Sequence, residues 1–222
     1  MNTGEIGGVN LRASIDRMNQ SGGGYSSSNP FVAPDLVASR TRENVRGIAV
    51  NATATHQTTT AVANVAGGSF AGVAATVSMN IIGGETTATV TDSVLNGGDN
   101  STASNAQAVS IKAADHAYGN TFIGSIAVGL AGVGASADVN VFDRDTRAGV
   151  SGSTSSVTAK GAATVKARSS QGVSSIVVGA AGGAVAVVGS GSVAKFTSTT
   201  EAYSDDAVWR FGELDIRADH DS

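Results

Sequence analysis

The sequence predicts an all-β protein built as a repetitive parallel β-solenoid (a β-helix), with a stack of long β-hairpins as the alternative. Two observations carry this prediction. First, a five-residue signature, apolar-x-apolar-(Lys/Arg/Asn)-Ala, occurs five times, and repeats of this size indicate stacked units that bury a core together. Second, large and small residues alternate with a period near two between the copies, which is the pattern of strands. The copies begin at Val9, Ile48, Val109, Ala163 and Leu214.

The first 47 residues read as a degenerate first repeat with a Gly/Ser-rich loop insertion at residues 21–30. Both prolines of the chain lie in this region, at Pro30 and Pro34, which indicates irregular structure. Residues 14–47 depart from the repeat pattern, and a capping or an interrupting role is left open for them.

Regular repeats are expected from residue 48 to residue 222. Three units, at about 48–108, 109–162 and 163–213, precede the start of a fourth at 214–222. Residues 80–88 align with 140–148 after a shift of 60, and these align with 194–202 after a shift of 54. Each unit therefore has a signature strand, a Gly/Ala/Val tract and a Thr-x-Ala strand that leads to a turn.

The tract of the second unit, residues 125–141, shows the alternation most clearly. Its larger apolar residues include Ile126, Val128 and Leu130, and small residues fill the positions between them. We expect such tracts to be buried strands, with Gly and Ala inside to let the opposing sheets lie close. In the signature strand we expect Ile111 to point inward and Lys112 outward, and Ser, Thr and Asn to form the outer faces.

Two other arrangements are compatible with parts of the pattern. Residues 61–82 and 176–194 carry no charge and are long enough for transmembrane helices, but their Gly- and β-branched-rich composition favours strands. An antiparallel stack of hairpins would turn at the glycine pairs 67–68 and 182–183. The sequence does not decide between parallel and antiparallel pairing.

Composition limits the classes of function. The chain has 222 residues, of which 41% are hydrophobic, 5% aromatic and 14% charged, so its core must be thin and its surface weakly charged. The net charge of −4 and the lack of a basic cluster argue against nucleic-acid binding. The absence of cysteine excludes disulfides, thiolate catalysis and Cys-bound zinc, and suits secretion. No secretory leader opens the sequence, so we expect an excerpt of a larger protein.

Three histidines are the first candidates for a site. His56 and His116 are 60 residues apart, the shift that aligns their units, His220 follows Asp219 as His116 follows Asp115, and the third unit has Ser170 there. A ladder of metal ligands is one interpretation, and a tolerant polar position is the favoured one. If each unit comprised several coils, successive histidines would be more than about 10 Å apart, too far to share an ion.

Four further features have a chemical and a plain interpretation, and the plain one is favoured each time. Asp143 and Asp145 could form a carboxylate pair, but they are not repeated and read as surface charge. Residues 96–100 are similar to one calcium-binding nonapeptide but occur once, so they read as a turn. The threonines of 86–91 do not recur as an ice-binding ladder, and Trp209 reads as a packing residue or edge cap. The sequence therefore predicts no catalytic, cofactor-binding or metal residues, no cofactor and no enzyme.

The repeat units resemble those of very large secreted bacterial filamentous adhesins. This group includes the leukotoxin-type repeat proteins that are exported by two-partner secretion or as autotransporters. The resemblance rests on residues 109–113, 127–141, 146–148 and 157–161 and covers about 48–222. It implies a secreted or surface-anchored β-solenoid stalk, associated with the bacterial outer membrane, that mediates adhesion and has no enzymatic site.

The expected function is thus a structural or adhesive segment of a long secreted or surface-anchored bacterial protein. Its expected partners are a component of a host or neighbouring cell surface or matrix, and further copies of itself end to end. No nucleic acid and no membrane span are expected. Two alternatives stay open: a membrane-active toxin segment whose uncharged tracts enter a bilayer, and a polysaccharide-acting β-helix enzyme.

Overall fold

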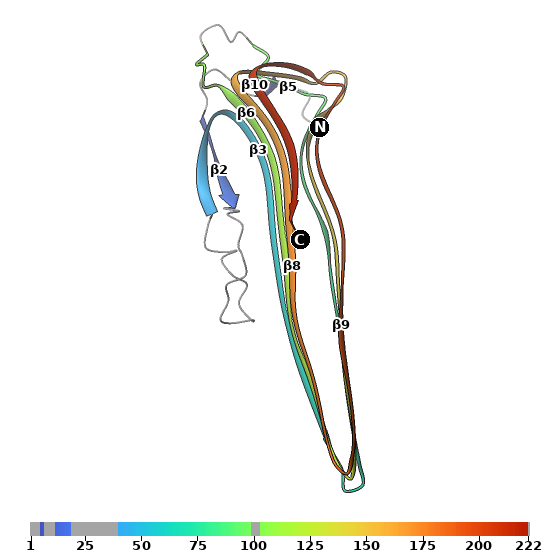
Figure 1. Ribbon diagram of the computed structural model, residues 1–222. Coiled ribbons are helices and arrows are strands. Elements are labelled where there is room, and N and C mark those ends of the chain that lie inside the picture. The colour runs from blue at the N-terminus through green and yellow to red at the C-terminus, as the bar shows by residue number, and fades with distance from the viewer. Residues whose placement is uncertain (1–4, 7–11, 19–39, 99–102, 222) are drawn as a thin grey trace.

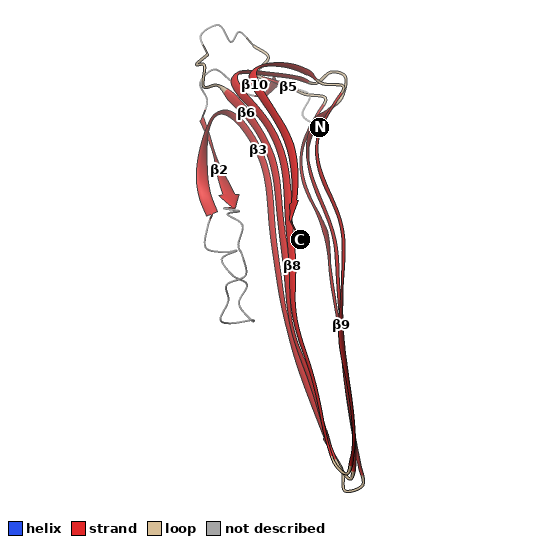
Figure 2. Ribbon diagram, in the orientation of Figure 1, coloured by secondary structure: helices blue, strands red, loops and turns tan. Residues whose placement is uncertain are grey.

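The computed structural model describes residues 5–6, 12–18, 40–98 and 103–221, and these form ten β-strands with turns between them (Figures 1 and 2). None of these residues lies in a helix, so this part of the protein offers no helix able to cross a membrane. The strands are β1 (Glu5–Ile6), β2 (Arg12–Met18), β3 (Arg40–Gly67), β4 (Ala71–Thr91), β5 (Val94–Leu95), β6 (Ala108–Val128), β7 (Ala131–Ser151), β8 (Ser156–Gly182), β9 (Val185–Asp205) and β10 (Val208–Asp221).

The long strands form two parallel sheets. The first contains β3, β6, β8 and β10 in that order, and the second contains β4, β7 and β9. The chain alternates between the sheets, because β3 leads into β4, β6 into β7 and β8 into β9 through turns of two or three residues. Each such strand pair stacks on the next one, and the two sheets converge toward the end where these turns lie (Figure 1).

The parallel pairing corrects the alternative of hydrogen-bonded hairpins. The turns at residues 68–70, 129–130 and 183–184 lie beside the glycine pairs at which hairpins were expected to turn. The strands that flank each turn nevertheless belong to different sheets, and each pairs with its equivalent in the neighbouring strand pair. The uncharged tracts 61–82 and 176–194 are therefore strand–turn–strand segments rather than transmembrane helices.

The signature predicts the register of the first sheet. Ile48 pairs with Val109, which pairs with Ala163, which pairs with Leu214. In the second sheet Ala88, Ala148 and Ala202 are paired, as the Thr-x-Ala alignment predicts. Each repeat is thus one strand pair, so neighbouring repeats are about 4.8 Å apart rather than several coils apart.

Two parts of the expected N-terminal repeat need separate mention. Residues 9–11 of the first signature copy and the loop at 21–30 lie outside the described residues. The last two residues of that copy, Arg12 and Ala13, pair antiparallel with Arg46 and Val45 of β3, whereas the other four copies pair in parallel.

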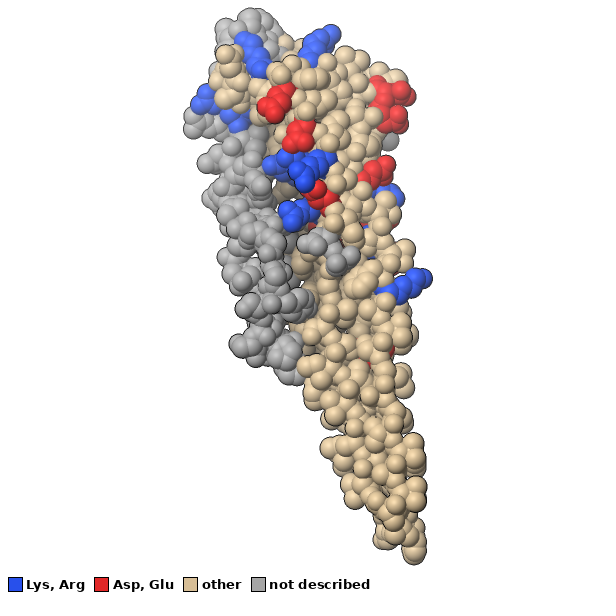
Figure 3. All heavy atoms as spheres, viewed as in Figure 1, with Lys and Arg blue, Asp and Glu red and all other residues tan. Residues whose placement is uncertain are grey.

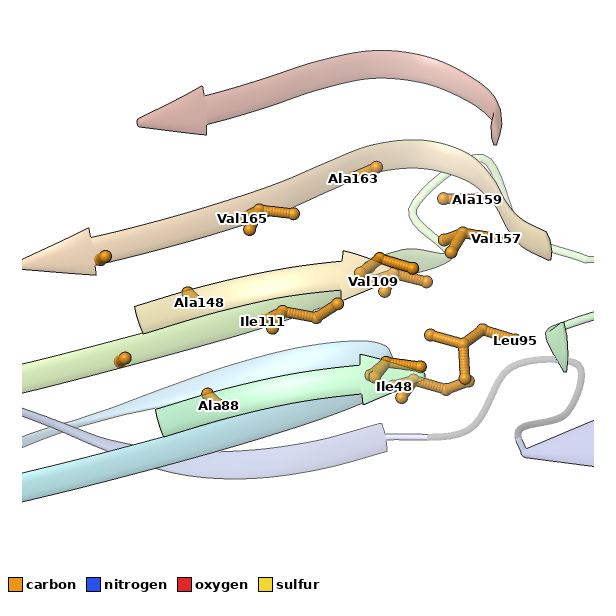
Figure 4. Close-up of a cluster of buried hydrophobic side chains, with 14 residues drawn as sticks. Ile48, Ala88, Leu95, Val109, Ile111, Ala148, Val157, Ala159, Ala163 and Val165 are labelled. Carbon is orange, nitrogen blue, oxygen red and sulfur yellow. The ribbon is translucent and has the colours of Figure 1, made fainter. Parts of the chain in front are cut away.

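An apolar core fills the broad half of the molecule. At this end β4, β7 and β9 finish and the chain passes on to the next strand pair. Ile111 and Val165 point into it and are fully buried, and Lys112 is on the opposite face, as expected. A short third side made by β5, the start of β8 and the start of β10 closes this core. The buried members are Ile48, Ala88, Val90, Leu95, Val109, Ile111, Ala113, Ala148, Val150, Val157, Ala159, Ala163, Val165 and Ala167 (Figure 4).

The turns at the narrow end depend on glycine. Gly183 has a φ of +154°, and a Cβ there would lie 2.1 Å from the carbonyl oxygen of Gly129. A Cβ added to its neighbour Gly182 would meet no atom within 4 Å. The stacking of successive turns therefore requires glycine at position 183, whereas position 182 has room for a side chain.

These two glycines give a matched test of the turn. We expect Gly183→Ala to lower the free energy of unfolding by about 1–3 kcal/mol, because the methyl group clashes with backbone. Gly182→Ala should leave it unchanged or raise it by up to about 1 kcal/mol, because it restricts the unfolded chain without a clash. Urea unfolding followed by circular dichroism measures both, and equal effects of the two substitutions would contradict the stacked turn.

Candidate functional surface and interior

The three histidines do not form a ladder, because no two of them lie at paired positions. His116 pairs with Thr55 and Ser170, whereas His56 pairs with Ala117 and His220 with Ser169. The shift between the first two repeats is 61 residues in the first sheet but 60 in the second. The turn at 68–70 is one residue longer than the turn at 129–130, so an alignment by 60 puts His56 and His116 on opposite faces of the sheet.

Asp143 and Asp145 lie on the outer face of the second sheet as surface charges. Asp145 is 3.4 Å from the guanidinium of Arg147, which is also 3.8 Å from Glu85 and 3.6 Å from Glu201. This row of opposite charges runs across all three strands of the sheet. Arg147 therefore offsets part of the negative charge of the three carboxylates around it, and Asp145 is ion-paired at the surface.

The other sequence candidates have structural surroundings. Asn96 is buried and donates to the carbonyl oxygen of Thr158 at 2.9 Å, while residues 99 and 100 of its turn lie outside the described residues. Trp209 pairs with Val157 and packs against the apolar core, as expected of a packing residue. In the threonine segment, the outward residue Thr89 pairs with Gly149, which pairs with Tyr203, so no threonine ladder forms there on the outer face; the row of paired threonines Thr86, Thr146 and Thr200 begins at buried Thr86 and Thr146.

A buried ion pair between the two sheets was not anticipated. Asp115 of β6 is 0% exposed and Arg144 of β7 is 1% exposed. The Arg144 Nε donates to one carboxylate oxygen of Asp115 at 2.9 Å, and its Nη2 donates to the other. Arg144 also donates to the carbonyl oxygen of Gly83 at 3.1 Å, and Thr86 donates to Asp115 at 3.2 Å. Both charges are thus hydrogen-bonded on several sides, as burial requires.

Strand alternation could have revealed this pair. Asp115 has the same parity along β6 as Ile111 and Ala113, which point inward. Arg144 lies between Asp143 and Asp145, so its side chain must point away from their exposed face. The spacing within each strand was sufficient to place both charges inside.

Beyond this ion pair the interior changes from apolar to polar. The stacked rings of Phe142 and Phe196, with centroids 4.9 Å apart, come first, and the next inward residues of β7 are Asn140, Asp138 and Ser136. Asn140 accepts from Asn80 at 3.0 Å and donates to Asp138 at 2.5 Å. Asp138, which is 1% exposed, also accepts from Ser175 at 2.6 Å. These bonds connect neighbouring strands and opposite sheets.

Close approach of the sheets explains why the interior is also made of small residues. A Cβ at Gly134 would lie 2.7 Å from the carbonyl oxygen of Ala180 in the opposite sheet. The hydroxyl of Ser136 reaches the carbonyl oxygen of Val178 at 3.1 Å, and that of Thr76 reaches Gly124 at 3.2 Å. No side chain fits at Gly134, and small residues fill most of the other inward positions, so most of the larger residues point outward and Ile123 is a buried exception.

The outer surface of this half is therefore apolar, which corrects two expectations. The tracts were expected to be buried strands, and Ser, Thr and Asn were expected on the outer faces. We name residues 61–81, 122–141 and 176–194 the distal arm. Its outward apolar residues are exposed in all three strand pairs, including the middle one, which has neighbours on both sides. They include Val65, Val73, Val77, Met79, Ile81, Ile126, Val128, Val133, Val178, Val185, Val187 and Val193.

Charge is confined to the other half of the molecule. Asp138 is the one charged residue in the sequence of the distal arm, and it points inward. On the face shown in Figure 3, the coloured Lys, Arg, Asp and Glu atoms lie over the broad half and the tapered half is free of them. The most distinctive surface of the chain is thus an uncharged, apolar, tapered arm.

Comparison of the chain with protein-family models, with curated proteins and with solved structures gives no match. The functional argument therefore rests on the stacked register of the strands and on the apolar arm.

The ion pair gives a test of the interior. Arg144→Met should lower the free energy of unfolding by about 3–5 kcal/mol, because it leaves the Asp115 carboxylate buried without its partner. The double substitution Asp115→Leu with Arg144→Met should recover most of that loss, since no buried charge remains.

Arg147→Met is the matched control, because Arg147 lies three residues further along β7 but on the exposed face, and its loss should cost at most about 1 kcal/mol. Urea unfolding measures all three variants. A double variant that is less stable than Arg144→Met would show that the pair is not the source of the effect.

Proposed function

We propose that this chain is a non-enzymatic scaffold: a parallel β-solenoid segment of a long secreted or surface-anchored bacterial protein that mediates attachment. In this proposal each strand pair is one coil of the solenoid. The observation that carries it is the continuous register of equivalent residues through three strand pairs and into β10. Repeats that share their interior only with their neighbours form elongated bodies.

The scaffold would act mechanically. The backbone hydrogen bonds of a parallel stack run along the stacking axis, so a pull on that axis is shared by two 21-residue strands, β6 and β7, and their neighbours. Polar side-chain bonds such as Asn80–Asn140 and the Arg147 charge row link neighbouring strand pairs. The lack of cysteine and the sparse charge are compatible with a secreted or outer-membrane-associated location.

Self-association would use the same backbone chemistry. In the second sheet β4 and β9 are the outer strands, and each presents one row of backbone groups that a further parallel strand could pair with. Of the other functions considered, polysaccharide hydrolysis gains no support from Asp143 and Asp145, since Asp145 is ion-paired with Arg147 on the outer face of the sheet. The membrane-active alternative gains one specific observation, the apolar exterior of the distal arm.

Engineered cysteines test the solenoid register against a background with no thiols. Thr91 of β4 and Ser151 of β7 are paired, and their hydroxyl oxygens are 3.2 Å apart. We expect Thr91→Cys with Ser151→Cys to form a disulfide under mild oxidation, because paired strands bring the two Cα atoms within bonding range.

The control is Thr91→Cys with Val150→Cys, in which the second thiol points to the opposite face of the sheet and should stay free. Mass spectrometry of the oxidised proteins reads out both variants. Equal yields from the two variants would contradict the register on which the proposal rests.

Attachment is tested with beads coated with the protein. We expect coated beads to adhere to cultured cells or to matrix-coated surfaces more than beads coated with albumin. Denaturing the coating should abolish the difference, because the presented surface depends on stacking. Adhesion no greater than that of albumin beads, or polysaccharide turnover that Asp143→Ala abolishes, would overturn the scaffold proposal.

A further inference from the structure

The end of the distal arm is an exposed apolar point. We name residues 67–71, 128–131 and 182–185 the tip. Phe70 is 81% exposed and Leu130 is 59% exposed, and both lie in the turns where the strands reverse. Val128 and Val185 beside them are also more than half exposed. Water contact of this much apolar surface at one place indicates a surface that is covered in use.

Backbone groups of neighbouring turns at the tip are hydrogen-bonded to one another. The Gly68 N–H donates to the Val128 carbonyl at 3.0 Å, and the Ala131 N–H donates to the Phe70 carbonyl at 2.9 Å. The next turn repeats the arrangement, with Gly129 donating to Gly182 at 3.0 Å and Ala184 donating to Leu130 at 2.9 Å. These groups would not lose hydrogen bonds on leaving water, which is the main cost of moving backbone into hydrocarbon.

Two serine side chains behind the tip, Ser125 and Ser136, are also hydrogen-bonded inside the arm. Ser136 donates within the arm to the Val178 carbonyl, and Ser125 lies 2.9 Å from Ser136. The outward positions of the second sheet are apolar or glycine from residue 71 to residue 81, a length of about 35 Å at about 3.3 Å per residue. The exterior of the arm thus offers dispersion contacts and no charges to its partner.

We infer that the tip docks into the surface of a fluid lipid bilayer with neutral, zwitterionic headgroups. A convex apolar point requires a matching groove in a protein partner, whereas fluid acyl chains adapt to it without one. The uncharged arm gives no electrostatic attraction to anionic lipid, and the net charge of −4 opposes it. This inference rests on the proposed scaffold, because the tip exists only when the turns stack, and it names the lipid surface as the partner in attachment.

The strand edges limit how deep the tip goes. β4 and β9 are outer strands of their sheet, and among the described residues no strand pairs with the outer row of backbone groups on either. Hydrocarbon does not tolerate such open edges. Docking therefore places the Phe70 and Leu130 turns in the headgroup and upper acyl region, about 5–10 Å deep. The bilayer stays sealed, which separates this inference from a membrane-active toxin.

Flotation with phosphatidylcholine vesicles tests the inference. We expect the protein to float with the vesicles to the same extent at low and high salt. The double variant Phe70→Ser with Leu130→Ser should lower the partition coefficient at least about tenfold, because two apolar anchors are lost. The matched control is Val208→Ser with Phe211→Ser, which removes two exposed apolar side chains from β10 in the broad half and should bind as the parent does.

A fluorescent variant reports the depth independently. Phe70→Trp should be quenched by lipids brominated on their acyl chains, while Trp209, in the broad half, should not. Circular dichroism and the Thr91–Ser151 cross-link on the same preparations show whether the scaffold itself is formed, so that failure of docking and failure of the scaffold are distinguished.

Four results would overturn the inference while the scaffold stands. They are no flotation of the parent protein, equal loss of flotation in the two double variants, release of a dye trapped in the vesicles, and concentration-dependent self-association that the tip variant abolishes in the absence of vesicle binding. The last result would identify a second copy of the chain as the occupant of the tip.

Discussion

In-register parallel pairing is the constraint on which the rest of the structure depends. Ile48, Val109, Ala163 and Leu214 are paired in one row. The residues that follow them in β3, β6, β8 and β10 are therefore paired in the same register as far as these strands extend. Each row repeats one kind of environment, inside or outside, in successive strand pairs. The apolar core, the Arg147 charge row and the Asn80–Asn140 bond are all consequences of that register.

The same register explains the change of polarity along the strands. In β7 the residues with even numbers point inward from Gly132 to Val150 without a break. The large apolar residues have even numbers near the broad end, at Phe142 and Val150, and odd numbers in the arm, at Val133 and Val139. In a strand without a bulge, alternate residues point to the same side along its whole length. The large apolar residues move from even to odd positions in the arm, so there they point outward. The Asp115–Arg144 ion pair and the Phe142–Phe196 stack lie where the change occurs.

Much of the fold could be predicted because the signature and the Thr-x-Ala strand recur in each repeat. Alignment of their copies gives the pairs of residues that lie side by side in the two sheets. The side that faces inward was predicted for Ile111 but not for the arm, because the alternation at Ile126 and Val128 was interpreted alone. Ile111 has an odd number and points inward, so the even-numbered Ile126 and Val128 of the same strand must point outward. In the structure these two side chains are exposed. The histidine alignment failed because it used the shift of 60 that aligns the second sheet, whereas the signature copies at Ile48 and Val109 are 61 residues apart. The ion pair was missed because the positions of Asp115 and Arg144 along their strands were not compared with those of inward residues such as Ile111, although their parity places them inside.

Thiol accessibility in β7 tests the polarity of the arm most directly, since the chain has no cysteine of its own. Single variants Ala135→Cys, Ser136→Cys and Ala137→Cys place a thiol at three consecutive positions of the middle strand pair. A water-soluble maleimide should label positions 135 and 137 rapidly and position 136 slowly, because only the middle one points between the sheets. Rapid labelling at 136 with protection at 135 and 137 would mean that the apolar side faces inward, and would contradict both the structure of the arm and the role assigned to its tip.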